Sequence, residues 1–191
     1  MGDIYFPSCN FNKATPETAK LLLERMKAIM PVAGCCRVDK LECPKGDRAL
    51  YLCQACREVI EVRFPELVPE NLLVWLDREE KFPLPDYSGL AVSIQDCWRD
   101  REHPEIHEAV RSLLKKMGVS FRDIPENREF ADYCGDLHFQ PDQAAKHGGL
   151  PVLCYCNRCK LCIGQDGGNA LHLMELVMGT YAREGEYGSR G

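Results

Sequence analysis

Cysteine is the residue type in this sequence with the clearest capacity for chemistry, and it occurs twelve times in 191 residues. Two pairs have the CxxC spacing: Cys53 with Cys56, and Cys156 with Cys159. Thiolates bind soft or borderline metals, and cysteine-only sets are typical of iron–sulfur clusters and of structural zinc. A CxxC pair supplies two sulfurs to one metal or cluster, so the remaining ligands must come from elsewhere in the chain. The sequence therefore predicts metal sites built from distant cysteines.

The cysteines recur in the same order in the two halves of the chain. Six residues separate Cys9 from Pro16, and six separate Cys97 from Pro104, each proline being followed by glutamate. A cysteine turn, an apolar segment and a CxxC pair then follow in both halves. An ordered series of this length indicates an internal duplication. It divides the cysteines into two candidate sets: Cys9, Cys35, Cys36, Cys53 and Cys56, and then Cys97, Cys134, Cys156 and Cys159.

The two sets differ in the metals they favour. Zinc takes four ligands in a tetrahedron, whereas the side chains of the neighbours Cys35 and Cys36 diverge. Two diverging sulfurs can reach different irons of a larger cluster, so the first set favours iron–sulfur. The four cysteines of the second set fit a cubane cluster, a two-iron cluster or zinc equally well.

Short apolar segments that precede the cysteines are predicted to be strands. They cover residues 4–7, 49–52, 89–96 and 150–153. Helices are expected to begin at Pro16, with Thr15 as N-cap, and at Pro104, because proline suits the first helical position. Each half then ends in an apolar segment, which begins after Asn71 in one and after Asn169 in the other.

Alternating strands and helices predict an α/β fold. We expect two pseudo-symmetric halves with short parallel sheets flanked by helices, and cysteine loops at the strand ends, where open α/β folds place their sites. The predicted boundaries are a first half at 1–82, a linker at 83–89, a second half at 90–182 and a flexible tail at 183–191.

Composition narrows the classes of function. The formal net charge is -5 and the pI about 5.6, which argues against nucleic acid as the main partner. No apolar run approaches the length needed for membrane insertion, and the N-terminus does not resemble a signal peptide. We therefore expect a cytoplasmic location, where thiols bind metals or do redox work. Disulfide bonding remains an alternative.

Taken together, these cysteine motifs resemble the duplicated cysteine-rich domain called CCG. That domain occurs in the B subunit of heterodisulfide reductase and in related iron–sulfur oxidoreductase subunits. The resemblance covers residues 5–178, and the local sequence near the cysteines also agrees with the family in residues 8–13 and 125–129.

The resemblance implies a noncubane four-iron cluster in the first half, held by Cys9, Cys35, Cys36, Cys53 and Cys56. It implies a second site held by Cys97, Cys134, Cys156 and Cys159. In heterodisulfide reductase such clusters cleave a disulfide by electron transfer. If the chain is catalytic, the first cluster is the expected centre, and no catalytic side chain is assigned.

Two positions depart from the family pattern. Arg37 follows the cysteine pair of the first half, where the family has glycine, and Tyr133 replaces the first cysteine of the pair in the second half. The second half is therefore left open to a cubane cluster, a two-iron cluster, zinc or an empty site. Asp136 and His138 could each supply a non-cysteine ligand there.

Three cysteines fall outside both sets. Cys154 ends a predicted strand and is interpreted as a core thiol, Cys162 as a core residue or a replacement ligand, and Cys43 as a loop thiol. The histidines at 103, 107 and 172 are interpreted as structural. Arg37 and Arg158 could stabilise thiolate charge or be ordinary surface residues.

The leading hypothesis is an iron–sulfur redox protein that carries electrons or reduces a disulfide or thiol-linked substrate. No nucleotide-binding motif is present, so electrons would come from a flavin- or ferredoxin-type partner. A zinc-stabilised, non-catalytic interaction module is the alternative. A thiol oxidoreductase that uses a bare CxxC pair is a third hypothesis.

Overall fold

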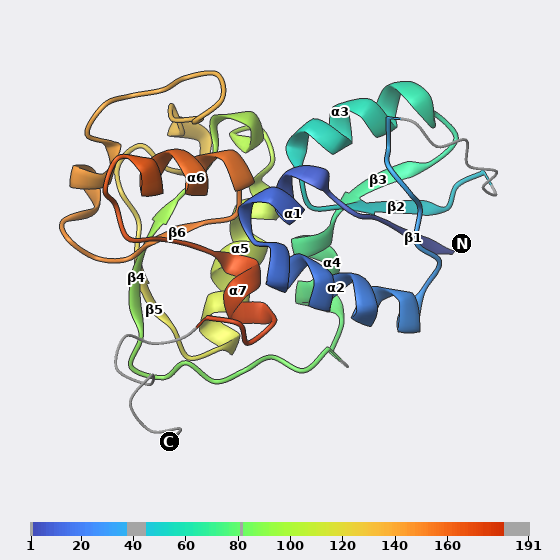
Figure 1. The fold of residues 1–191 in the computed structure, drawn as a ribbon, viewed down its shortest axis with the longest axis horizontal. Helices are drawn as coiled ribbons and strands as arrows, with labels where there is room; N and C mark the ends of the chain where they lie inside the picture. The colour runs from blue at the N-terminus through green and yellow to red at the C-terminus, as the bar shows by residue number, and fades with distance from the viewer. Residues whose placement is uncertain (1, 38–44, 81, 182–191) are drawn as a thin grey trace.

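Two parallel β-sheets form the framework of the chain in the computed structural model, which describes residues 2–37, 45–80 and 82–181 (Figure 1). The first sheet has the strand order β1-β2-β3 and the second β5-β4-β6-β7. The predicted α/β fold with short parallel sheets is therefore confirmed. The strands are β1 (Asp3–Phe6), β2 (Arg48–Tyr51), β3 (Val68–Asn71), β4 (Ala91–Gln95), β5 (Ser120–Arg122), β6 (Val152–Cys154) and β7 (Ala170–His172).

Helices flank both sheets, and the two long ones begin at the expected prolines. Thr15 occupies the N-cap position of α2 but makes no capping hydrogen bond through its side chain; its Oγ1 instead donates to the carbonyl of Phe11 at 3.2 Å. The α-helices are α1 (Cys9–Ala14), α2 (Pro16–Ile29), α3 (Gln54–Arg63), α4 (Leu72–Arg78), α5 (Pro104–Lys116), α6 (Asn157–Gln165) and α7 (Leu173–Val177). Three short 3-10 helices are η1 (Trp98–Asp100), η2 (Arg128–Phe130) and η3 (Gln143–His147).

The strand order repeats between the halves. In the second sheet β4 lies between β5 and β6, and in the first sheet β1 pairs with β2 on one side. On its other side Tyr5 of β1 forms a parallel bridge with Val32, in the place that β5 occupies beside β4. The same arrangement, reduced to one bridge in the first half, is what an internal duplication predicts.

One predicted correspondence between the halves is wrong. Asn71 ends β3 and caps α4, its Oδ1 accepting from the N–H of Leu73 at 2.9 Å. The residue at that place in the second half is His172, which ends β7 and accepts from the N–H of Met174 at 3.1 Å, whereas Asn169 precedes β7. An amide oxygen and a neutral imidazole nitrogen can each accept a hydrogen bond from a free N–H at a helix start. The capping residue of the second half could therefore not be found by looking for asparagine.

A shared hydrophobic core holds the two halves together. Along β1 the side chains alternate, so that Tyr5 joins a cluster containing residues of both halves, while Ile4 and Phe6 join a smaller cluster with Ile60 of α3. Helix α4 packs against α5, and α1 against α6, near the centre of the molecule (Figure 1). Each fully buried large apolar side chain stabilises the fold by roughly 1.5–3 kcal/mol.

No helix among the described residues has both the length and the apolar character to cross a membrane. The boundaries proposed for the halves and the linker stay predictions. The tail at 183–191 and Cys43 lie outside the described residues.

Candidate functional site

Strand ends deliver cysteines to the site in both halves. Cys9 begins α1 just after β1, and Cys53 follows β2 as the N-cap of α3. In the second half Cys97 follows β4 as the N-cap of η1, and Cys156 follows β6 as the N-cap of α6. Because neighbouring parallel strands end at the same edge of a sheet, cysteines far apart in sequence come together there.

The second set forms a compact thiol cluster. The sulfurs of Cys97, Cys156 and Cys159 all lie within 4.8 Å of one another, and all three residues are buried. Cys134 is also buried and is in hydrogen-bond contact with Cys97 and Cys159. The triad of Cys97, Cys156 and Cys159 could therefore hold a metal ion, and Cys134, the fourth cysteine predicted for this set, lies beside two of its members.

A tight turn positions Cys134. Its N–H donates to the carbonyl of His138 at 3.3 Å, and its own carbonyl accepts from the N–H of His138 at 2.7 Å. Gly135 packs directly on α6: a Cβ added there would lie 2.8 Å from Sγ of Cys162 and 2.9 Å from the carbonyl of Arg158. Only glycine lets this turn approach α6 closely enough for Cys134 to reach Cys97 and Cys159.

Hydrogen bonds divide the four thiols into donors and acceptors. The pKa values of Cys134 and Cys156 are lowered, first by a hydrogen bond from Cys159 and then by one from Cys97. The pKa values of Cys97 and Cys159 are raised, chiefly by their hydrogen bonds to Cys134. Metal ligands must be deprotonated, so a bound metal would take the place of the protons shared in this cluster.

The first set is partly assembled around Cys56. Cys36, Cys53 and Cys56 are buried, and Cys56 is in hydrogen-bond contact with both of the others. Burial raises the pKa of Cys36, and the nearby charges of Cys35 and Cys9 raise it further. Cys35 is half-buried and Cys9 is exposed. The structure thus brings three of these sulfurs into contact and places the other two within electrostatic reach of Cys36.

The thiol of Cys53 has a lowered pKa. A hydrogen bond from Cys56 lowers its pKa to about 6, and Asn10 helps by donating from Nδ2 to Sγ of Cys53 at 3.5 Å. At neutral pH a thiol with this pKa is largely thiolate, the form that acts as a nucleophile or metal ligand.

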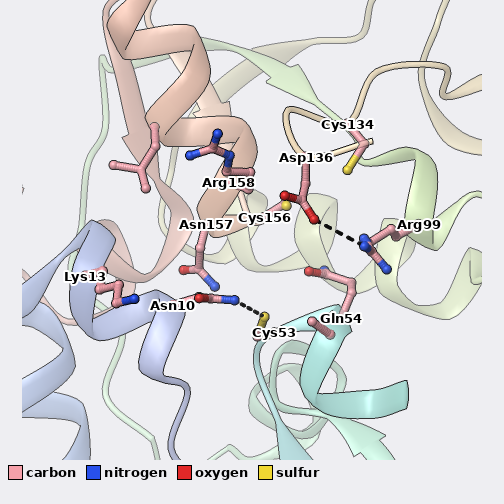
Figure 2. A pocket seen from close by; sticks show the side chains of 12 residues that line it. Asn10, Lys13, Cys53, Gln54, Arg99, Cys134, Asp136, Cys156, Asn157 and Arg158 are labelled. Atoms are coloured by element: carbon pink, nitrogen blue, oxygen red, sulfur yellow. Dashed lines mark hydrogen bonds and ion pairs between the residues drawn. The ribbon is translucent and has the colours of Figure 1, made fainter. Parts of the chain in front are cut away.

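A cavity of about 260 Å³ separates the two sets and is bordered by both. Cys53 lines it from the first half, and Cys134 and Cys156 line it from the second (Figure 2). Cys53 and Cys156 are close enough that the charge of Cys156 opposes ionisation of Cys53. Sulfurs from both halves therefore meet at one small space.

Sequence reasoning gave roles to Asp136 and Arg158 at this cavity but none to the three amide residues or the lysine that also line it. Asn10, Gln54 and Asn157 each follow directly after a cysteine of the two sets, and all three line the cavity. The sequence did offer a signal for these three residues, because each stands directly after a candidate ligand at the start of a helix. Lys13, one turn further along α1 from Asn10, had no such signal.

A buried ion pair also joins the halves beside the cavity. Arg57 of α3 pairs with Asp100 of η1 at 3.1 Å, and Nε2 of Gln54 donates to the same carboxylate at 2.5 Å. Burial raises the pKa of Asp100 to about 7, although Arg57 favours its ionised form. These bonds hold the helix that begins after Cys53 against the turn that follows Cys97.

The remaining candidates have other partners. The exposed ring of His138 packs on Trp98 with 4.4 Å between centroids, and Asp136 pairs with Arg99 at 3.4 Å. Cys154 is fully buried and takes no part in the hydrogen bonds of either cysteine set. Sγ of Cys162 donates to the carbonyl of Gly135 at 3.2 Å. All eleven cysteines of the described chain are free thiols.

No protein-family model matches this sequence, and no curated protein matches it either.

Proposed function

We propose that the chain is an iron–sulfur redox protein of the CCG type, which transfers electrons and reduces a disulfide or thiol-linked substrate. One observation carries the proposal: cysteines of both sets, Cys53 from one and Cys134 and Cys156 from the other, border the same cavity. A purely structural metal would need no opening toward a ligand-sized space, whereas a redox centre that acts on a substrate does.

The proposed ligands follow the two sets. Cys9, Cys35, Cys36, Cys53 and Cys56 would hold a noncubane four-iron cluster. The contacts of Cys36 and Cys53 with Cys56 support this set, and an exposed Cys9 at the start of α1 could complete it. Cys97, Cys134, Cys156 and Cys159 would hold a second iron–sulfur cluster or zinc.

The reaction needs an external reductant. Cleavage of a disulfide consumes two electrons and two protons and gives two thiols. Bound clusters would supply the electrons, which a flavin- or ferredoxin-type partner would deliver to them. The chain's own part is to hold the substrate sulfur in the cavity, with Asn10 stabilising the Cys53 thiolate and the Arg57–Asp100 pair keeping the two cysteine sets in place.

Anaerobic purification tests the proposal. We expect a coloured protein that contains iron and acid-labile sulfide, a paramagnetic resonance signal that changes on reduction, and consumption of dithiodipropionate with reduced viologen as the electron donor. A colourless protein that holds stoichiometric zinc and leaves the viologen oxidation rate unchanged would exclude this function.

A structural zinc site is the second candidate, and the four buried thiols of the second set favour it. Three of these sulfurs lie within 4.8 Å of one another and Cys134 contacts two of them, so the set could supply the four ligands of structural zinc. In that case metal analysis gives one zinc per chain, a chelator destabilises the fold, and the protein shows no viologen-dependent disulfide reduction before or after chelation.

A further inference from the structure

Asn157 has hydrogen-bonding capacity that the protein does not use. The residue is 2% exposed, and neither Oδ1 nor Nδ2 of its amide has a hydrogen-bond partner. Its side chain points into the cavity between the two cysteine sets (Figure 2). Leaving a buried amide unsatisfied costs roughly 1–3 kcal/mol, so a partner that comes from outside the chain would recover that cost.

Two positive charges line the same cavity without a carboxylate partner. Lys13 comes from α1 and Arg158 from α6, and both are exposed. Within residues 2–37, 45–80 and 82–181, neither forms an ion pair with an acidic side chain. Arg99, the third basic residue at the cavity, differs because it pairs with Glu58 and Asp136.

Backbone geometry adds to the positive potential. Asn157 and Arg158 are the first two residues of α6, a helix of nine residues. The free N–H groups of a first helical turn carry partial positive charge and attract anions. Helix α1, which carries Lys13, packs against α6, so the lysine, the arginine and the unpaired amide lie along one side of the cavity (Figure 2).

We propose that Lys13, Asn157 and Arg158 form a subsite for the acid group of a small anionic thiol or disulfide compound. The acid group would pair with the two cations and accept a hydrogen bond from Nδ2 of Asn157, which leaves the sulfur of the compound on the side of Cys53 and Cys156. The sulfur-binding part rests on the proposed redox function; the acid-binding part does not. A cavity of about 260 Å³ admits only a small compound.

Thioethers test the subsite without reacting with the cysteines. Calorimetric titration of the anaerobically purified, metal-containing protein would use thiodipropionate, which is anionic, thiodiglycol, which is neutral, and bis(aminoethyl) sulfide, which is cationic. We expect thiodipropionate to bind at least about tenfold more tightly than thiodiglycol, and the cationic thioether to bind most weakly, because charged hydrogen bonds are the stronger ones. Equal affinity for all three overturns the subsite.

Matched variants locate the effect. Lys13→Gln and Arg158→Gln should each weaken thiodipropionate binding about fivefold or more and leave thiodiglycol unchanged. Lys20→Gln removes the same charge from an exposed lysine of α2 that does not line the cavity. If Lys20→Gln weakens thiodipropionate binding as much as the other two, general electrostatic attraction explains the result and the subsite is wrong.

The two proposals fail separately. Iron and sulfide are counted on the same sample that is titrated. If the protein contains no iron–sulfur cluster but binds thiodipropionate more tightly than thiodiglycol, the acid subsite is supported and the redox function is excluded. If it contains iron–sulfur but binds the three thioethers equally, only the subsite is excluded.

Discussion

Nη1 of Arg57 lies 3.1 Å from Oδ1 of Asp100, and this ion pair joins α3 of the first half to η1 of the second. The side chains are 11% and 0% exposed, so water barely reaches the pair. Cys53 precedes α3 and Cys97 precedes η1. The contact therefore fixes the distance between the two cysteine sets as well as the packing of the halves.

Removal of Arg57 should destabilise the fold strongly. Above the Asp100 pKa of about 7, Arg57→Met leaves a buried carboxylate without its cation, and breaking comparable buried pairs costs about 3–5 kcal/mol. The free energy of unfolding is measured by urea titration. Arg78→Met is the control, because Arg78 is 53% exposed in its pair with Glu70 and such pairs contribute about 1 kcal/mol or less. Equal losses in the two variants would contradict the role given to the buried pair.

Gly135 should be required for the second metal site. In Gly135→Ala the new methyl group meets Sγ of Cys162 and the carbonyl of Arg158, so the turn moves and Cys134 is displaced. We expect loss of the metal bound by the second set, measured by metal analysis of the purified protein.

Gly164→Ala provides the comparison within α6. A Cβ at Gly164 meets nothing within 4 Å, and alanine in a helix is more stable than glycine by about 0.5–1 kcal/mol. This variant should keep its metal and gain stability. Metal retained in full by Gly135→Ala would show that the turn can move without cost.

Two cysteines on α6 should respond differently to serine substitution. Cys159→Ser removes a sulfur from the cluster with Cys97 and Cys156, and should abolish metal binding by the second set. Cys162→Ser keeps a donor for the carbonyl of Gly135 and should retain the metal. If both variants lose the metal equally, Cys162 is a ligand and the proposed set is wrong.

Cys36→Ser should affect the first set alone. Cys36 is in hydrogen-bond contact with Cys56, so its replacement removes one of the three assembled sulfurs. We expect loss of the iron held by the first half and of the viologen-dependent disulfide reduction, while the metal of the second set remains. Full iron content with an unchanged absorption spectrum would rule out Cys36 as a ligand.

Buried His147 should make the fold less stable in acid. Burial lowers its pKa to about 4, and its ring nitrogens bond Ser93 Oγ at 2.8 Å and Gln95 Oε1 at 3.1 Å. The pKa in the unfolded chain is about 6.5. The neutral ring is favoured by folding, so this contribution to stability is complete above pH 6.5 and is lost as pH falls through 4.

The size of the effect follows from the two pKa values. A difference of about 2.5 units corresponds to a loss on the order of 3 kcal/mol between pH 7 and pH 4. Urea titrations at several pH values measure it, with His147→Asn as the variant that cannot take up the proton. His172, whose pKa burial lowers to about 3, also makes the fold less stable in acid, and it does so equally in the wild-type protein and in His147→Asn. Parallel pH profiles for the two proteins would refute the assignment to His147.

Strands β1, β2, β4 and β6, the starts of the two long helices and a close grouping of the second cysteine set were predictable from the sequence, whereas β3, β5 and β7 were not. Each of the predictable features depends on a local pattern: an apolar run ahead of Cys53 or Cys156, a proline at the start of α2 or α5, and a CxxC pair at a helix start. Local patterns are visible because a few neighbouring residues fix the backbone dihedrals and the side that each side chain faces.

Which residues share the space between the halves could not be predicted from the sequence, because it follows from the packing of distant elements. The Arg57–Asp100 pair, the unpaired amide of Asn157 and its neighbours Lys13 and Arg158 depend on how α1 and α3 pack against η1 and α6. Even the helix cap of the second half changed residue type, from Asn71 to His172. Such contacts join residues more than 40 positions apart, and their partners are set by the burial of a common core, which no short stretch of sequence records.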